Sequence, residues 1–133
     1  MGVRFIPDEI VPLIHADLVK RYGGASGIRD RGLLASALAQ PKATAHGKFL
    51  HRTIFEKDAA YGFHVCKNHP FIGGNKRLAF VLIDMFLQKN GWTLNASEED
   101  AYEIMIKLAS GTLAKTSLAA WAKLKSSKSS RQA

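Results

Sequence analysis

The chain has 133 residues, 47% of them hydrophobic, which is the size of a single domain that can bury a real core. No apolar run approaches the length needed to cross a bilayer, and the N-terminus lacks the apolar stretch of a secretory signal, so we expect no membrane association. The one cysteine, Cys66, excludes an internal disulfide and is typical of a cytoplasmic protein in a reducing environment.

The formal net charge of +8 is compatible with a basic nucleic-acid-binding module, but its distribution argues against one. Some of the excess is spread thinly, and the rest lies at or in the C-terminal tail, in Lys123, Lys125, Lys128 and Arg131. We expect a single domain over residues 1–124, followed by a basic, Ser-rich, disordered tail over residues 125–133. Direct nucleic-acid binding is therefore the less favoured function.

Helical periodicity and capping residues predict the first two elements. Apolar residues at helical spacing indicate a helix over residues 8–22, which the glycine pair at 23–24 ends. His15 lies on this helix, where a single histidine is more often a packed or surface residue than a ligand. Asp30 is suited to cap a second helix that runs to about Ala39.

The middle of the chain begins with a basic connection, residues 41–52, for which the sequence alone favours a simple surface loop. Thr53 and Glu56 have the spacing of a capping box and predict the start of a third helix. Cys66 falls on the apolar side of this helix, where we expect a buried thiol rather than a nucleophile.

Three more helices complete the expected fold. The nearly continuous apolar run 78–87 predicts a helix at the centre of the molecule, ended by Asn90-Gly91. Ser97 is suited to cap a fifth helix, and a short sixth helix carries Trp121. The prediction is an all-α fold, a compact bundle of about six helices with room for a small hairpin at 41–52.

The stretch His69-Pro-Phe-Ile-Gly-Gly-Asn-Lys-Arg77 joins two of these helices. The glycines at 73–74 permit positive φ and a close approach to a bound group, and the helix start that follows offers unpaired N–H groups and a positive dipole end. Lys76 and Arg77 add two cations in the first turn, where they oppose the helix dipole. An anionic ligand would explain that placement, so the stretch predicts a phosphate-binding loop that includes Gly74.

Transfer of a phosphoryl group requires a base for the attacking hydroxyl and cations that hold the phosphates. His69 is the candidate base, since imidazole accepts protons near neutral pH. Arg77 offers a planar fork to two phosphate oxygens and Lys76 a point charge. Asn75 can donate to a phosphate or stiffen the loop, while Phe71 is expected to anchor the loop in the core.

Six of the seven defined positions of this stretch match the signature of the Fic/Doc family, His-Pro-Phe-x-Asp/Glu-Gly-Asn-x-Arg. Lys76, at the variable position before the arginine, is similar to the death-on-curing (Doc) branch. The segments 22–24, 27–34 and 59–61 also resemble that branch, so the likeness covers roughly residues 3–122. It implies a Fic-like helical fold in which residues 41–52 form a flap that pairs with a target segment as an added strand.

The resemblance also implies an activity. Most of the family transfers AMP to a protein hydroxyl, whereas in the Doc branch a lysine such as Lys76 fills the space for the α-phosphate, and the γ-phosphate of ATP is transferred instead. The branch acts as the toxin of a toxin–antitoxin pair, with elongation factor Tu as its target and an antitoxin whose disordered tail inhibits it. AMP transfer stays open as an alternative.

Gly73 is the one departure from the signature, because the family carries there an acidic residue that holds magnesium. Mg²⁺ prefers carboxylate and phosphate oxygens, so the expected magnesium is doubtful here and we expect an impaired activity. The sequence then supplies no metal ligand. A catalytically silent Fic-fold binding protein is a further alternative.

Overall fold

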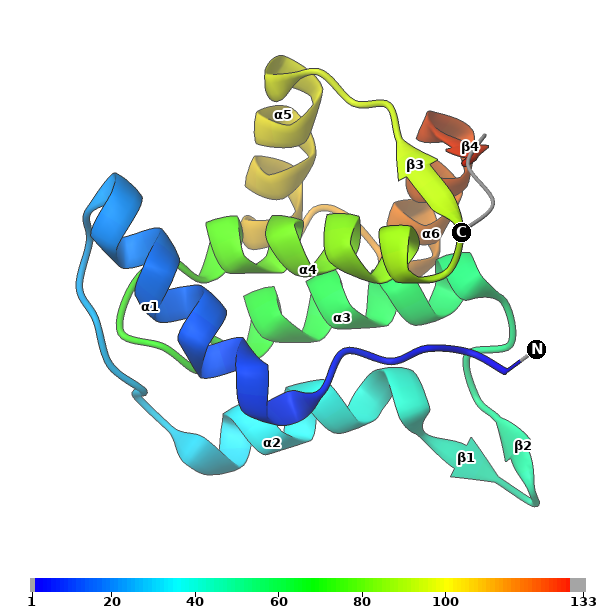
Figure 1. The fold of residues 1–133 in the computed structure, drawn as a ribbon, viewed down its shortest axis with the longest axis horizontal. Coiled ribbons are helices and arrows are strands. Elements are labelled where there is room, and N and C mark those ends of the chain that lie inside the picture. Colours follow the sequence, from blue (N-terminus) through cyan, green and yellow to red (C-terminus); the bar gives the residue numbers. More distant parts are fainter. Residues whose placement is uncertain (1, 130–133) are drawn as a thin grey trace.

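The structure is a computed structural model that describes residues 2–129 (Figure 1). Helices dominate this part of the chain, with α3 and α4 side by side at its centre. In chain order the elements are η1 (Asp8–Ile10), α1 (Val11–Tyr22), α2 (Arg31–Ala39), η2 (Gln40–Lys42), β1 (Thr44–Ala45), β2 (Lys48–Phe49), α3 (Ile54–Asn68), α4 (Asn75–Lys89), β3 (Trp92–Leu94), α5 (Glu98–Ala109), α6 (Lys115–Lys125) and β4 (Ser126–Lys128).

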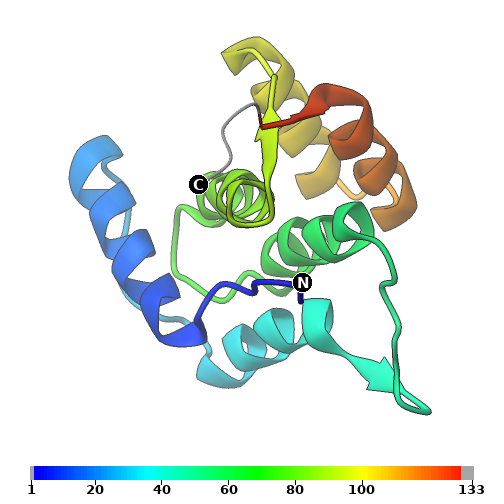
Figure 2. The same cartoon turned by 45° about the vertical axis from the view of Figure 1, so that its right-hand side comes forward.

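The helix α4 is the centre of the core, as its apolar run predicted. Figure 2 looks nearly along α4 and shows α1 on one side of it, α5 above and α3 below. Close approach of α3 and α4 requires Gly62, because a Cβ there would lie 2.5 Å from Ile83 Cδ1. The all-α bundle of six helices is thus confirmed for the described residues, none of whose helices is long and apolar enough to cross a membrane. Its fully buried α4 side chains are Leu78, Ala79, Leu82, Ile83, Phe86 and Leu87.

The expected capping residues begin their helices. The Asp30 carboxylate accepts from the Leu33 N–H at 2.9 Å, and Ser97 caps α5 in the same way. At the start of α3, the Thr53 hydroxyl accepts from the Glu56 N–H, while the Glu56 carboxylate accepts from the Thr53 N–H, which completes the capping box. These local bonds set the directions in which α2, α3 and α5 leave their loops.

The strands β1 and β2 form a small antiparallel hairpin, with Thr44 opposite Phe49. His46 and Gly47 make its turn, both at positive φ, and its strand residues are exposed. The hairpin allowed for residues 41–52 is therefore confirmed, and the simple loop that the sequence alone favoured is wrong. Pairing across the turn satisfies backbone groups that an irregular loop would leave to water.

The expected tail needs correction at its start. The helix α6 extends to Lys125, and β4 then pairs antiparallel with β3, with Trp92 opposite Lys128 and Leu94 opposite Ser126. Polar composition suggested disorder, but the backbone of β4 gains hydrogen bonds from β3 and the Lys128 amine lies 5.8 Å from the centre of the Trp92 ring. The last part of the expected tail, residues 130–133, lies outside the described residues.

Two neighbouring charged side chains of α3 are buried. The Lys57 amine donates to the carbonyls of His51 and Arg52 at 2.7 and 3.1 Å, which ties the end of the hairpin segment to α3. Asp58 is fully buried, and neither carboxylate oxygen has a hydrogen-bond partner among the described residues. Burial, followed by the negative charge of Asp84, raises the pKa of Asp58 well above its ordinary value.

Asp58→Asn should therefore stabilise the protein. A carboxyl group whose pKa is raised on folding binds more protons in the folded protein, so the free energy of unfolding falls as the pH rises above the ordinary value of 3.8. We expect the variant to lose this dependence and to exceed the parent at neutral pH by about 1–3 kcal/mol. Urea unfolding at about pH 5 and about pH 8 measures both effects.

The control is Asp84→Asn, which should reduce the pH dependence without abolishing it, since desolvation is the larger cause of the Asp58 shift. An unchanged pH dependence in Asp58→Asn would contradict the assignment.

Candidate active site

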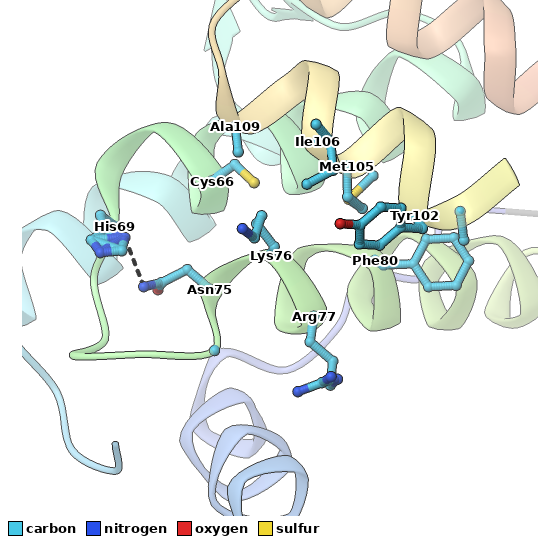
Figure 3. Close-up of a pocket in the computed structure, with 12 residues that line it drawn as sticks. Cys66, His69, Asn75, Lys76, Arg77, Phe80, Tyr102, Met105, Ile106 and Ala109 are labelled. Atoms are coloured by element: carbon cyan, nitrogen blue, oxygen red, sulfur yellow. Dashed lines mark hydrogen bonds between the residues drawn. The ribbon is translucent and has the colours of Figure 1, made fainter. Parts of the chain in front are cut away.

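A cavity of about 640 Å³ lies between the end of α3, the start of α4 and one face of α5 (Figure 3). Five of the six residues expected to form the site line it, and the sixth, Phe71, lies beneath it in the core at 1% exposure. The lining residues are Cys66, His69, Gly74, Asn75, Lys76, Arg77, Phe80, Ala101, Tyr102, Met105, Ile106 and Ala109.

His69 directly follows the last residue of α3 and has φ 51° and ψ 54°, in the left-handed region. That conformation is uncommon for a residue with a side chain and turns the chain sharply out of the helix. It places the imidazole at the edge of the cavity, six residues before the start of α4 in sequence but next to it in space (Figure 3).

Asn75, the first residue of α4, closes the loop that begins at His69. Its side-chain oxygen accepts from the Phe71 N–H at 3.0 Å, and its side-chain nitrogen donates to the Phe71 carbonyl at 2.9 Å. The same nitrogen lies 2.8 Å from His69 Nδ1 (Figure 3). Asn75 is 4% exposed, so these bonds form away from solvent. Of the two expected roles for Asn75, this geometry supports stiffening of the loop.

The Asn75 contacts also determine which nitrogen of His69 carries the proton. The amide oxygen is taken by the Phe71 N–H, so the amide turns an N–H towards His69 Nδ1, which must accept it. In the neutral ring the proton then lies on Nε2. For this ring to accept a proton from a substrate, the Asn75 N–H has to leave Nδ1, or the ring has to change its tautomer, when substrates bind.

His15 supports the loop from α1. Its ring stacks on the Phe71 ring, with centroids 3.8 Å apart, and its Nε2–H donates to the Gly73 carbonyl at 2.7 Å. His15 is 2% exposed, so it is packed, as expected for a single helical histidine. Its role in supporting the loop has no signal in the sequence, because 58 residues separate it from Gly73.

The start of α4 has the properties of an anion site. Gly74 precedes the helix at φ 74°, no side chain caps the helix start, and its first turn carries no acidic residue. Lys76 and Arg77 are exposed in that turn and line the cavity. The Arg77 guanidinium extends towards α1, where it lies 4.4 Å from the centre of the Tyr22 ring. Unpaired N–H groups, the helix dipole and two cations therefore act together on one side of the cavity.

The opposite side of the cavity is largely apolar. It is formed by Phe80 of α4 and by one face of α5, whose exposed Tyr102 and Ile106 the sequence did not single out. Cys66 also lines the cavity, and burial raises the pKa of its thiol to about 11, although the Lys76 charge acts in the opposite direction. The thiol is half-buried rather than buried as expected, but it is protonated and not nucleophilic. A wall of apolar and aromatic groups facing cations suits a ligand with both a ring and phosphates.

The residues present do not fit a magnesium ion held by protein carboxylates. No Asp or Glu lines the cavity, and the described residues contain no group of three metal-binding side chains. Gly73 does not have positive φ, but a Cβ there would lie 3.3 Å from the Ala25 backbone nitrogen, so a larger residue requires a small shift of that loop.

Tyr22→Leu tests whether the aromatic ring holds Arg77 in place. We expect the affinity for inorganic pyrophosphate, measured by calorimetry, to fall about two- to fivefold, because a solvent-exposed cation–π contact contributes about 0.5–1 kcal/mol. Tyr22→Phe keeps the ring and should bind like the parent. Thermal stability should not change in either variant, since Tyr22 is 62% exposed. Equal losses in the two variants would rule out a role of the ring.

Comparison with known proteins shows the family to which the chain belongs. The family model described as Fic/DOC family matches residues 5–87, which include the whole loop and the start of α4. The chain is 39% identical to Toxin Doc of Mycolicibacterium smegmatis over 75 residues, 56% of this chain and 58% of that protein. It is 29% identical to Protein kinase doc of Escherichia phage P1 over 113 residues, 85% of this chain and 87% of that protein. The chain therefore belongs to the Fic/Doc family.

Proposed function

We propose that the protein is the toxin of a toxin–antitoxin pair and transfers the γ-phosphate of ATP to a hydroxyl of a translation protein, elongation factor Tu. The observation that carries this proposal is the juxtaposition of an imidazole and an anion site at one cavity. His69 lies at the cavity edge, and Lys76 and Arg77 line it beside the uncapped start of α4. The names of the two relatives, a toxin and a protein kinase, support the same function.

The proposed reaction is a direct transfer of a phosphoryl group from ATP to a hydroxyl. The hydroxyl oxygen of the target attacks the γ-phosphorus, the bond from that phosphorus to the bridging oxygen breaks, and ADP leaves. His69 takes the hydroxyl proton once its hydrogen bond to Asn75 has been broken. A positioned base contributes about a hundredfold to ten-thousandfold in rate. Lys76 and Arg77 balance the phosphate charge. Lys76, which resembles the lysine of the Doc branch, supports γ-phosphate transfer over AMP transfer.

The partners follow from the same family resemblance. The hairpin of β1 and β2 is exposed, which supports a flap to which a target segment adds as a strand. Inhibition is assigned to an antitoxin with a disordered tail that folds on the toxin. A catalytically silent binding protein is the second candidate, and the absence of a carboxylate at Gly73 favours it.

The assay that tests the function uses ATP labelled separately in the γ- and α-phosphates, with elongation factor Tu as acceptor. We expect only the γ-label to transfer and His69→Asn to reduce the rate at least about a hundredfold. Asparagine tolerates the left-handed conformation at φ 51°, so the variant should fold. The control is Lys107→Asn, a change to the same residue at an exposed position of α5 that lies outside the cavity and the hairpin. Transfer of the α-label would instead indicate AMP transfer.

Gly73→Asp tests the missing carboxylate. A bound metal supplies several kcal/mol of charge stabilisation, and about 1.4 kcal/mol is a factor of ten in rate. We expect the variant to transfer phosphate at least about tenfold faster than the parent when Mg²⁺ is present, and to bind ATP in a Mg²⁺-dependent way.

The matched control is Gly73→Asn, which meets Ala25 with nearly the same shape but carries no charge. Circular dichroism and thermal melts confirm equal amounts of folded protein. Equal transfer by the parent, Gly73→Asp and Gly73→Asn would show that the carboxylate is unimportant.

A further inference from the structure

The conformation of His69 needs support from outside its own helix. A left-handed backbone costs free energy for a residue with a Cβ, and it persists where surrounding contacts hold it. Pro70 follows directly, so His69 cannot simply continue α3. If the backbone relaxed to the extended region that a residue before proline prefers, the imidazole would leave its place beside Asn75.

Arg29 supplies that support. Its Nε donates to the His69 carbonyl at 2.7 Å, and its Nη2 donates to the Asn68 carbonyl at 2.9 Å. Carbonyls at the end of an α-helix lack partners within the helix and carry the negative end of its dipole. A guanidinium matches two adjacent acceptors with its rigid fork and also brings a positive charge to that end.

The backbone around Arg29 fixes the guanidinium in this position. The Arg29 N–H donates to the Pro70 carbonyl at 2.7 Å, and the Ile72 N–H donates to the Gly27 carbonyl at 3.0 Å. Ile28 and Phe71 form an isolated antiparallel bridge between these bonds. The segment 27–29 therefore runs alongside the loop, and its arginine side chain reaches back to the carbonyls where α3 ends.

From these contacts we propose that Arg29 is a positioning residue for His69. It holds the His69 backbone in the left-handed conformation, while Asn75 holds the ring. Arg29 does not line the cavity, so in this proposal it acts through His69 rather than on a ligand in the cavity. The relevance of this contact to catalysis rests on the proposed function, in which His69 accepts the proton.

Arg29→Gln is the direct test, with ¹⁵N chemical shifts of the His69 ring and ¹³C shifts of its backbone as readouts that need no activity. In the parent we expect a ring protonated at Nε2 and left-handed backbone shifts. In Arg29→Gln we expect averaging over both ring tautomers and a loss of the left-handed shifts. The matched control is Arg31→Gln, an exposed arginine at the start of α2, which should leave His69 unchanged. Unchanged His69 signals in Arg29→Gln would overturn the proposal.

Transfer kinetics add a second readout. We expect kcat of Arg29→Gln to fall at least about tenfold with the KM for ATP changed less than about twofold, since the anion site at α4 is intact. In a His69→Asn background, Arg29→Gln should cost nothing further, and an added loss there would contradict the proposal. If the parent transfers no phosphate, the proposed function fails while the spectroscopic readout still decides the role of Arg29.

Arg29→Lys covers the case in which Arg29→Gln does not fold. Lysine keeps the charge at the end of α3 but cannot bridge both carbonyls in a fixed fork, so His69 should be partly displaced in a folded protein. Native His69 signals in Arg29→Lys would show that His69 keeps its conformation without the contact of the arginine fork with both carbonyls. Unfolding of both variants would assign Arg29 to the stability of the whole fold. Either result overturns the positioning role.

Discussion

One side-chain amide, that of Asn75, determines the shape of the site. It bonds both backbone groups of Phe71, which closes the loop between α3 and α4, and its remaining N–H meets the His69 ring. An aspartate there could not donate these bonds, and an apolar residue would leave the buried N–H and carbonyl of Phe71 unpaired. Asn75 is also the first residue of α4, so the same side chain fixes the loop relative to the helix start that faces the cavity.

What could be predicted from the sequence is what depends on neighbouring residues. Asp30 and Thr53 cap N–H groups only three residues further along the chain, so these caps were predictable. The burial of α4 was predictable because its residues are almost all apolar. The loop from His69 to Arg77 is contiguous, so its cavity-lining side chains come together without knowledge of the tertiary fold. Within the loop, the sequence did not show which of the two glycines has positive φ. The structure gives it to Gly74 and not to Gly73.

What could not be predicted depends on how distant segments pack. His15 and Arg29 contact the loop across 58 and 40 residues of sequence, and the directions of their side chains follow from where α1 and the segment before α2 lie. Tyr102 reaches the cavity because α5 packs against α4. Serine and lysine in β4 resemble a solvated tail by composition, and their order comes from the partner strand rather than from their own side chains.

The pairing of β4 with β3 has a consequence for any shortened form of the protein. Within the described chain, β4 is the strand that pairs with β3, opposite Trp92 and Leu94. If the chain were trimmed after α6 on the assumption that the rest is dispensable, the backbone groups of β3 would become an open sheet edge flanked by a large aromatic ring. Such an edge is a template for pairing with another molecule, so the trimmed protein would tend to self-associate and aggregate.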